Sequence, residues 1–247
     1  MQGPYIGVTG FMTSSEVEAV LGALPEKSRY SLMVGVLASG KALQGEQGKW
    51  PGRYSAIGKI KDIFVPDLRA VNLIHYATAD RTNLPDQLKA LVELGGRFLN
   101  GFQLNMAWPN PCDLEGIAFR GLRIVLQIGT KALEQSQSMS GFRELLGAYD
   151  GLITDVLIDP SGGTGQPFNV EDVRSRLSIV REYFPKLGFG VGGGLSWETI
   201  DAIVPLASEF PGLSIDAEGR LRTPQPEDKL DVERAKQYVL RAFQIMG

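Results

Sequence analysis

Short apolar runs alternate with longer amphipathic segments along the whole chain. Most of these runs carry β-branched residues or leucine on both faces, which is typical of parallel strands that are covered on both sides. The runs predict eight strands, which are Tyr5–Thr9, Leu32–Leu37, Ala70–Tyr76, Gly101–Asn105, Ile124–Ile128, Gly151–Ile158, Gly188–Val191 and Leu213–Asp216.

Helical signals lie in the segments between the predicted strands. Thr13–Glu16 has the form of a capping box and predicts a helix that ends near Leu24. Gly95 and Gly96 can adopt the positive φ found just after a helix. Asn169 and Ser196 are expected N-caps, and the charged stretch Glu227–Lys229 precedes the last helix. The other predicted helices are Pro85–Leu94, Val170–Tyr183, Ser196–Ala207 and Asp231–Met246.

Eight strands with intervening helices predict a parallel (β/α)8 barrel, that is, a TIM barrel. The length of 247 residues suits one such barrel, so residues 1–247 are expected to form a single domain. An open doubly wound sheet is the alternative, but only Gly10 stands where its dinucleotide fingerprint would begin. The long, glycine-rich connection Ala38–Ser55 is typical of an active-site lid or of a surface excursion.

Composition narrows the range of partners. Apolar residues make up 43% and charged residues 21% of the chain, as in a globular protein with a sizeable core. The net charge is −3 and the basic residues are dispersed, which argues against nucleic acid or an anionic membrane as a partner. The start Met1–Pro4 has no export signal and no apolar run is long enough to span a bilayer, so a cytoplasmic location is expected.

The chain contains one cysteine, Cys112, and one histidine, His75. These counts exclude an intrachain disulfide and the usual zinc sites, so we expect no metal and no cofactor. His75 ends the third predicted strand, where it is either a base that titrates near neutral pH or a hydrogen-bonded structural residue. Cys112 offers a thiol from a later loop, or is an ordinary small apolar residue.

The sixth predicted strand leads into the strongest chemical signal. Asp159 lies at its C-terminal end, where the active sites of such barrels occur, and a carboxyl there is suited to general acid–base work. Gly162, Gly163 and Thr164 follow in a glycine-rich stretch that lets the backbone approach a ligand closely. The alternative is that Asp159 only accepts hydrogen bonds from its own turn.

The ends of strands seven and eight predict a phosphate site. Gly192, Gly193 and Gly194 are followed by a predicted helix, and bare amides at a helix N-terminus bind anions. Gly219 can complete this cradle from the next loop. Arg220 either adds positive charge or is solvated, and Asp216 is expected to brace the barrel mouth.

Asp159–Phe168, Gly192–Leu195 and the turn Asp216–Gly219 resemble phosphoribosylanthranilate isomerase, the family of tryptophan biosynthesis. The likeness is strongest over Gly151–Leu221. Val8–Phe11 is similar to the family's Ile-Cys-Gly-Leu, and Gln103–Asn105 is similar to its Gln-Leu-His. The family's reaction is an Amadori rearrangement, in which an acid protonates the ring oxygen of an aminoaldose phosphate and a base removes the C2 proton.

The resemblance implies a role for several residues. Asp159 would be the acid, and Thr9 stands where the family has its basic cysteine, with His75 or a water molecule as other candidates for the base. Lys41 and Arg53 are the candidates for binding a substrate carboxylate after strand two. The full set of expected substrate-binding residues is Lys41, Arg53, Gln103, Asn105, Gly162, Gly163, Thr164, Gly192, Gly193, Gly194 and Gly219.

Three functions are therefore open. The first is an isomerase resembling phosphoribosylanthranilate isomerase that acts on a small phosphorylated sugar-like substrate. The second is a regulatory or binding barrel that kept the phosphate site and lost the chemistry. The third is a phosphate-dependent lyase or aldolase, for which Lys41 is the best Schiff-base candidate. Barrels of this kind occur as monomers and homodimers, and either is expected here.

Overall fold

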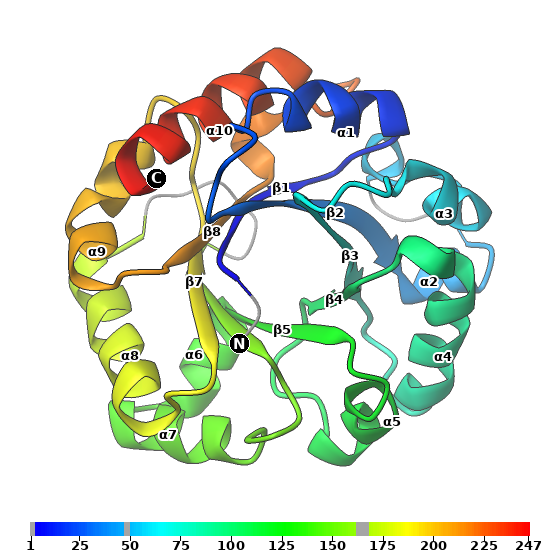
Figure 1. Cartoon of the computed structure of the whole chain (residues 1–247). Helices are drawn as coiled ribbons and strands as arrows, with labels where there is room; N and C mark the ends of the chain where they lie inside the picture. Colours follow the sequence, from blue (N-terminus) through cyan, green and yellow to red (C-terminus); the bar gives the residue numbers. More distant parts are fainter. Residues whose placement is uncertain (1–2, 47–49, 162–167) are drawn as a thin grey trace.

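A computed structural model describes residues 3–46, 50–161 and 168–247. Its eight strands are all parallel and close into a barrel in chain order, with β8 pairing back onto β1 (Figure 1). This confirms the predicted (β/α)8 fold. The strands are β1 Tyr5–Thr9, β2 Ser31–Ser39, β3 Ala70–Ala77, β4 Gly101–Leu104, β5 Arg123–Gly129, β6 Asp155–Asp159, β7 Gly188–Gly192 and β8 Ser214–Ala217.

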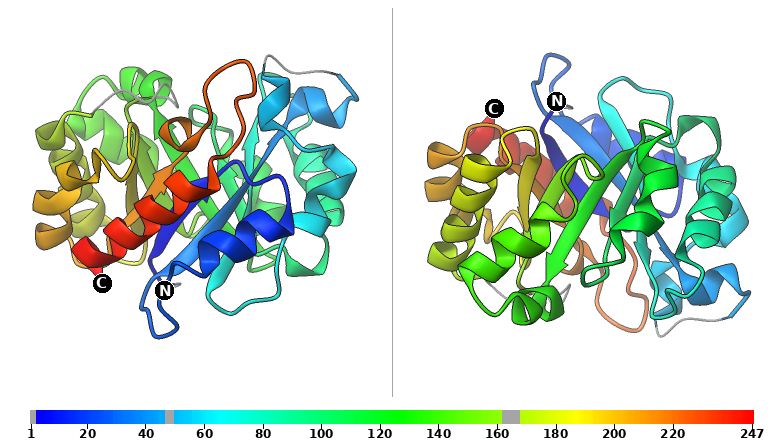
Figure 2. Two further views of the ribbon diagram at one scale, coloured as in Figure 1. Left: turned by 90° about the horizontal axis from the view of Figure 1, so that it is seen from above. Right: turned by 90° about the horizontal axis from the view of Figure 1, so that it is seen from below.

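Helices surround the barrel on its outer side (Figure 1). Both termini lie at one end of the barrel, and the segment between β8 and the last helix lies at the other (Figure 2). No helix of the described chain is long and apolar enough to span a membrane. The α-helices are α1 Ser14–Leu21, α2 Gly40–Leu43, α3 Ile60–Ile63, α4 Leu84–Gly95, α5 Glu115–Ala118, α6 Thr130–Ser136, α7 Met139–Gly147, α8 Val170–Tyr183, α9 Val204–Glu209 and α10 Val232–Met246.

Side-chain caps place several helix ends where they were predicted. The Thr13 hydroxyl accepts a hydrogen bond from the amide of Glu16, and the Glu16 carboxylate accepts one from the amide of Thr13, which confirms the capping box of α1. Asn169 accepts from two amides at the start of α8. Gly96, with φ of 66°, follows the end of α4. Helix α1 itself ends at Leu21, one turn earlier than predicted.

The predicted helix Ser196–Ala207 is wrong in its first half. The chain forms a turn after Ser196, then a 3₁₀ helix over Ile200–Ile203, and α-helix only from α9 onward. The Thr199 hydroxyl accepts from the amide of Ser196 at 2.9 Å and donates to the carbonyl of Gly194 at 2.7 Å. These local side-chain bonds stabilise the turn in place of the first helical turn. Consequently, the glycines after β7 do not open directly into a helix.

The sixth strand begins later than predicted. It was expected over Gly151–Ile158, whereas β6 runs from Asp155 to Asp159. Gly151 has φ of 78° in the turn that follows α7, so the chain reaches an extended conformation only after it. The strand also ends one residue later than predicted, so that Asp159 is its last residue.

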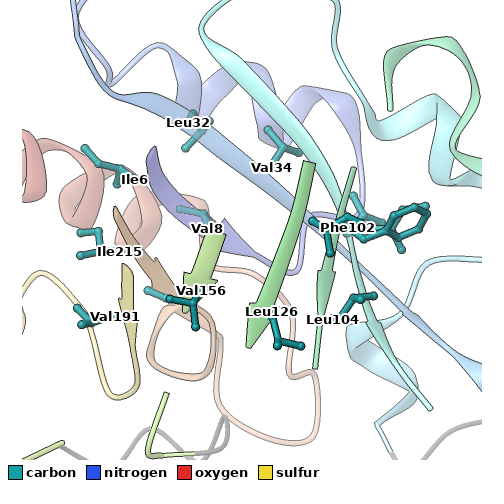
Figure 3. Packing of buried hydrophobic residues seen from close by; sticks show 14 of the residues in the cluster. Ile6, Val8, Leu32, Val34, Phe102, Leu104, Leu126, Val156, Val191 and Ile215 are labelled. Carbon is teal, nitrogen blue, oxygen red and sulfur yellow. The ribbon is translucent and has the colours of Figure 1, made fainter. Parts of the chain in front are cut away.

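Alternate residues of each strand face opposite sides of the barrel wall. One set faces the helices and forms the main core, which includes Ile6, Val34 and Ile215 (Figure 3). The other set fills the barrel interior, where Met33, Leu73, Val125 and Leu157 pack with Tyr5 in a second apolar cluster. Polar side chains lie on either side of this interior cluster along the barrel axis.

A buried ion pair closes the N-terminal end of the barrel. Arg123, the first residue of β5, donates from Nε and Nη2 to the two oxygens of Asp155, the first residue of β6, at 2.8 and 2.5 Å. Its guanidinium carbon lies 4.8 Å from the ring centroid of Tyr5, and Nη1 donates to the carbonyl of Gly3 at 3.1 Å. Both charged side chains are almost completely buried.

This arrangement predicts a large loss of stability for Arg123→Ala. The substitution leaves the Asp155 carboxylate buried without its cation, which costs about 3–5 kcal/mol in comparable pairs. Urea unfolding of the wild type, Arg123→Ala and Lys236→Ala measures this loss of stability. Lys236→Ala is the control, because Lys236 pairs with Glu233 on the exposed face of α10. Exposed pairs contribute at most about 1 kcal/mol. Equal losses in the two variants would contradict this account of the barrel floor.

Candidate functional site

Polar side chains end the interior face of six strands at the C-terminal end of the barrel. This is the end at which barrels of this class place their active sites. All six residues are buried, and the two carboxyl groups among them, Asp159 and Asp216, are 5% and 6% exposed. The six residues, called the polar ring below, are Thr9 on β1, His75 on β3, Gln103 on β4, Gln127 on β5, Asp159 on β6 and Asp216 on β8.

Asp159 is held by three hydrogen-bond donors. Gln127 Nε2 donates to its Oδ2 at 2.7 Å. The amide and the hydroxyl of Ser161 donate to its Oδ1 at 3.1 and 2.7 Å. The turn bonds that sequence reasoning offered as an alternative are thus present, but they occupy only one of the two oxygens. The other oxygen is joined to β5 and so to the rest of the polar ring.

Asp216 accepts hydrogen bonds from two side chains. The Thr9 hydroxyl donates to its two oxygens at 3.1 and 3.2 Å, and Gln103 Nε2 donates to Oδ2 at 2.8 Å. The pKa of Asp216 is raised to about 7, mainly by burial and also by the negative charges of Glu218 and Asp159, while the hydrogen bonds from Gln103 and Thr9 oppose this rise. Asp216 therefore titrates near neutral pH.

Two glutamine amides join the two carboxyl groups. Gln103 Nε2 donates to Gln127 Oε1 at 3.1 Å, and Gln127 in turn donates to Asp159. Because Gln103 also donates to Asp216, an unbroken line of hydrogen bonds runs from β8 through β4 and β5 to β6. This line of hydrogen bonds through Gln103 and Gln127, called the amide line below, orients both carboxyl groups at the barrel mouth.

His75 lies between the side-chain amides of Gln103 and Asn105. Its Nδ1 lies 3.1 Å from Gln103 Nε2, and its Nε2 lies 3.2 Å from Asn105 Nδ2. Burial lowers the pKa of His75 to about 4, and the charge of Asp159 opposes this only in part. The imidazole is thus neutral at pH 7 and weakly basic, which favours the structural interpretation of His75 over its role as a base.

The glycine loop after β7 lies directly against the two carboxyl groups. A Cβ atom on Gly192 would lie 3.4 Å from Asp159 Cβ and 3.6 Å from the carbonyl oxygen of Asp216. Gly193 has φ of 103°, and a Cβ there would lie 2.9 Å from both Asp159 Oδ1 and Ser161 Oγ. At Gly193 both the positive φ and this close approach to Asp159 favour glycine, whereas a Cβ on Gly192 would be in ordinary van der Waals contact.

A small cavity of about 20 Å³ opens between these groups. Both carboxyl groups line it, and so does a third, that of Glu218. Gly192, Gly193, Gly194 and Gly219 line the same cavity, so the structure brings the predicted reactive and phosphate ends together. Arg220, whose role the sequence left open, lines it as well. Gly219 belongs to a 3₁₀ helix over Gly219–Leu221. Because the helix after β7 begins late, any anion here would meet backbone amides rather than a helix N-terminus.

A wider cleft adjoins this cavity, and a second wide cleft lies next to the first. The first, of about 490 Å³, shares Gln127 and Ser161 with the cavity and also contains Arg81 and Lys131. The second, of about 460 Å³, continues over β2 and β3, with Lys41 and Asn105 in its wall. Asn105 lines both clefts, so they lie side by side, and the two together are called the wide groove below. Lys41, on the short helix α2, is exposed to this groove.

Arg53 is engaged by two carboxyl groups. Its Nη1 donates to Glu218 at 3.0 Å and its Nε donates to Asp228 at 2.6 Å. Arg222, which is buried, also donates to Asp228. These bonds connect the long segment after β2 to the segment after β8. The pKa of Arg53 is raised, since these hydrogen bonds and charges outweigh its burial, so its charge is fully committed within the protein.

Three predicted binding residues, Gly162, Gly163 and Thr164, lie outside the described residues. No group of three or more histidine, cysteine or acidic side chains suited to a metal occurs in the ranges 3–46, 50–161 and 168–247. Cys112 is exposed in a 3₁₀ helix over Pro111–Leu114 and does not line any of the three cavities described above.

No protein-family model and no curated protein matches this sequence. Solved structures match almost all of it. Phosphoribosyl anthranilate isomerase from Thermococcus kodakaraensis is 17% identical, with 97% of this chain and 98% of that chain covered and a TM-score of 0.61. N-(5'-phosphoribosyl)anthranilate isomerase from Pyrococcus furiosus is 14% identical, with 98% and 100% covered and a TM-score of 0.65. KGPDC from Streptococcus mutans, in complex with a small phosphorylated ligand, is 12% identical, with 100% of both chains covered and a TM-score of 0.58. This chain shares their fold.

Sequence reasoning missed two residues of the polar ring. Gln127 was given no role beyond its place in the predicted strand Ile124–Ile128, and Asp216 was expected only to brace the barrel mouth. The available signal was positional: a polar residue two places after Val125 faces the same side of the strand and therefore the interior. Which side chains it would meet across the barrel depends on the strand register, which one sequence does not show.

The raised pKa of Asp216 predicts how stability changes with pH. Folding favours the protonated carboxyl, so its contribution is present at low pH and is lost as the pH rises from about 4 to about 7. Asp216→Asn stays neutral, and we expect it to become more stable than the wild type across this window, by up to about 4 kcal/mol at about 1.4 kcal/mol per pKa unit.

Urea unfolding at several pH values measures this difference, and Asp67→Asn is the control of opposite sign. Hydrogen bonds from Arg69 lower the pKa of Asp67, so its contribution is present at neutral pH and lost as the pH falls. Asp67→Asn should therefore lose stability at pH 7 and not at low pH. A wild-type advantage over Asp216→Asn that grows as the pH rises would contradict the pKa of Asp216.

Proposed function

We propose that this protein is an isomerase of a phosphorylated, sugar-like substrate that works by general acid–base catalysis and resembles phosphoribosylanthranilate isomerase. One observation carries the proposal: two buried carboxyl groups, Asp159 and Asp216, line the same cavity as the glycines after β7 and β8. A proton donor and a proton acceptor beside an anion site are what an aldose–ketose rearrangement of a sugar phosphate requires.

The phosphate would bind against the backbone of Gly192, Gly193, Gly194 and Gly219. Loops of bare amides after strands seven and eight are a frequent phosphate site in (β/α)8 barrels. The structures of similar fold support a phosphorylated ligand, since two are phosphoribosylanthranilate isomerases and one is a complex with a small phosphorylated molecule. Gly162, Gly163 and Thr164 remain proposed members of this site.

At the reactive end, Asp216 supplies the second proton-transfer group, for which the resemblance offers only the position on β1. Thr9 occupies that place in the sequence, and its hydroxyl donates to Asp216, which makes Thr9 a positioning residue. A carboxyl with a pKa of about 7 exchanges protons readily at neutral pH, whereas a buried histidine with a pKa of about 4 does so poorly. Gln103 would orient the substrate and Asp216 together.

The wide groove would take the organic part of the substrate. Lys41 is its proposed cation for a carboxylate, and Asn105 lies where the groove meets the polar ring. Arg53 pairs with Glu218 and Asp228, so it would connect the segment after β2 to the segment after β8 instead of binding the ligand. Lys41 is on an exposed helix, which disfavours a Schiff base there, because a catalytic lysine is usually desolvated.

Turnover of phosphoribosylanthranilate tests the reaction. Asp159→Asn and Asp216→Asn should each lower kcat/KM by about 10²–10⁴, the usual contribution of general acid–base catalysis. Asp62→Asn, an exposed carboxyl on α3, should not change it. The absence of turnover of this substrate and of related aminoaldose phosphates by folded protein would overturn the isomerase and leave the binding or regulatory barrel.

The phosphate site is tested separately with inorganic phosphate and ribose 5-phosphate. Both should raise the melting temperature of the wild type. Gly193→Ala should weaken binding at least about tenfold, because its Cβ would displace the loop from Asp159 and Ser161. Gly151→Ala is the matched control: it also has positive φ, but its Cβ would meet no atom within 4 Å. If the two variants lose ligand protection equally, the cradle is elsewhere.

A further inference from the structure

The two carboxyl groups receive different kinds of hydrogen bond. Asp159 has three donors, and one of them is a backbone N–H, from Ser161, which can only donate. Asp216 has the Thr9 hydroxyl and one amide N–H from Gln103. A hydroxyl can reverse and accept a proton from a neutral carboxyl. The surroundings of Asp159 thus require an acceptor, whereas those of Asp216 suit either state.

The direction of the amide line strengthens this difference. Gln127 can donate to Asp159 only while its oxygen faces Gln103 Nε2, at 3.1 Å. Turning either amide over would place an amide oxygen against Asp159 Oδ2 or against the oxygen of Gln127. In this orientation Gln103 Oε1 has no partner among the described residues. Gln127 thus directs its donor toward Asp159, whereas Gln103 donates both to Gln127 and to Asp216.

Among the residues that the structure describes, Asp216 has only neutral hydrogen-bond donors, although Arg220 lines the same cavity. Neither lysine nor arginine donates to it within the described chain, and its hydrogen-bonding neighbours are neutral. The titratable groups that act on it or that it acts upon are Asp159, Glu218, and the phenols of Tyr5 and Tyr238, with His75 beyond Gln103. Two carboxyl groups in one buried site do not both ionise easily, so the one with fewer fixed donors keeps its proton.

We infer that Asp216 carries the proton in the free protein and Asp159 is the ionised carboxylate, so that Asp216 is the acid and Asp159 the base. These roles are the reverse of those that the resemblance implies. The chemical part of the inference rests on the proposed function. The location of the proton does not.

The steps balance without any further reagent. The Asp216 proton passes to the ring oxygen of the substrate as the C1–O bond breaks, leaving an iminium and the Asp216 carboxylate. Asp159 then takes the C2 proton, and the electron pair of that C–H bond forms the C1–C2 double bond as the iminium becomes an amine. The enol product tautomerises to the ketose. One proton has moved from Asp216 to Asp159 through the substrate, and exchange with water restores the starting state.

Infrared difference spectroscopy over about pH 5 to about pH 9 locates the proton without any substrate. Apart from Glu218, whose pKa burial also raises, the wild type should show a distinct buried carboxylic acid that ionises near pH 7. Its C=O band should be absent in Asp216→Asn and retained in Asp159→Asn. Loss of the band in Asp159→Asn alone, or no carboxyl that ionises above about pH 5, would overturn the inference.

Thr9→Val keeps the test decisive if Asp216→Asn does not fold. The Thr9 hydroxyl favours the ionised form of Asp216, so its removal should move the band to higher pH. A band that belongs to Asp159 would not move, because Thr9 does not contact that residue.

The pH dependence of kcat/KM tests the roles. If Asp216 is the acid, the rate falls as the pH rises through about 7; if it is the base, the rate rises over the same range. If kcat/KM instead rises with pH through about 7 and this rise is absent in Asp216→Asn, the assignment is overturned. If no substrate turns over, the proposed function fails, and the infrared result still decides where the proton lies.

Discussion

Two carboxyl groups buried in one small cavity cannot both be ionised at low cost, and the rest of the site is arranged around this constraint. Asp159 is compensated by the backbone and hydroxyl of Ser161 and by an amide of β5. Asp216 has no comparable set of donors and keeps a pKa of about 7. The pair therefore holds one proton near neutral pH, which is the state required for moving a proton onto and off a substrate.

The barrel supplies this arrangement through its register. Strands β6, β7 and β8 lie side by side, and Gly192 on β7 pairs with Asp216 while it leaves room beside Asp159. Any side chain on β7 at that level would fill the cavity between the two carboxyl groups. The proposed phosphate site uses the same glycine loop, so the reactive groups and that site would share one structural cause. The wider groove is built from other loops and is free to differ between proteins of this fold.

Much of the fold was predictable because strand and helix periods are local properties of the sequence. The eight strands, the capping box at Thr13 and the N-cap Asn169 all follow from neighbouring residues. The helix predicted from Ser196 failed because the Thr199 hydroxyl competes for the same backbone groups, and propensity does not show which contact is stronger. In the site, Asp159 and the glycines were found from the sequence. Gln127 and the role of Asp216 depend on contacts across the barrel, which require the closed register.

A crystal structure with ribose 5-phosphate bound tests the central claim most directly, since it would show both ends of the site at once. The account predicts the phosphate against the backbone of Gly192–Gly194 and Gly219, and the first two sugar carbons between Asp159 and Asp216. A sugar phosphate bound in the wide groove near Lys41, with both carboxyl groups out of reach of the sugar, would contradict it.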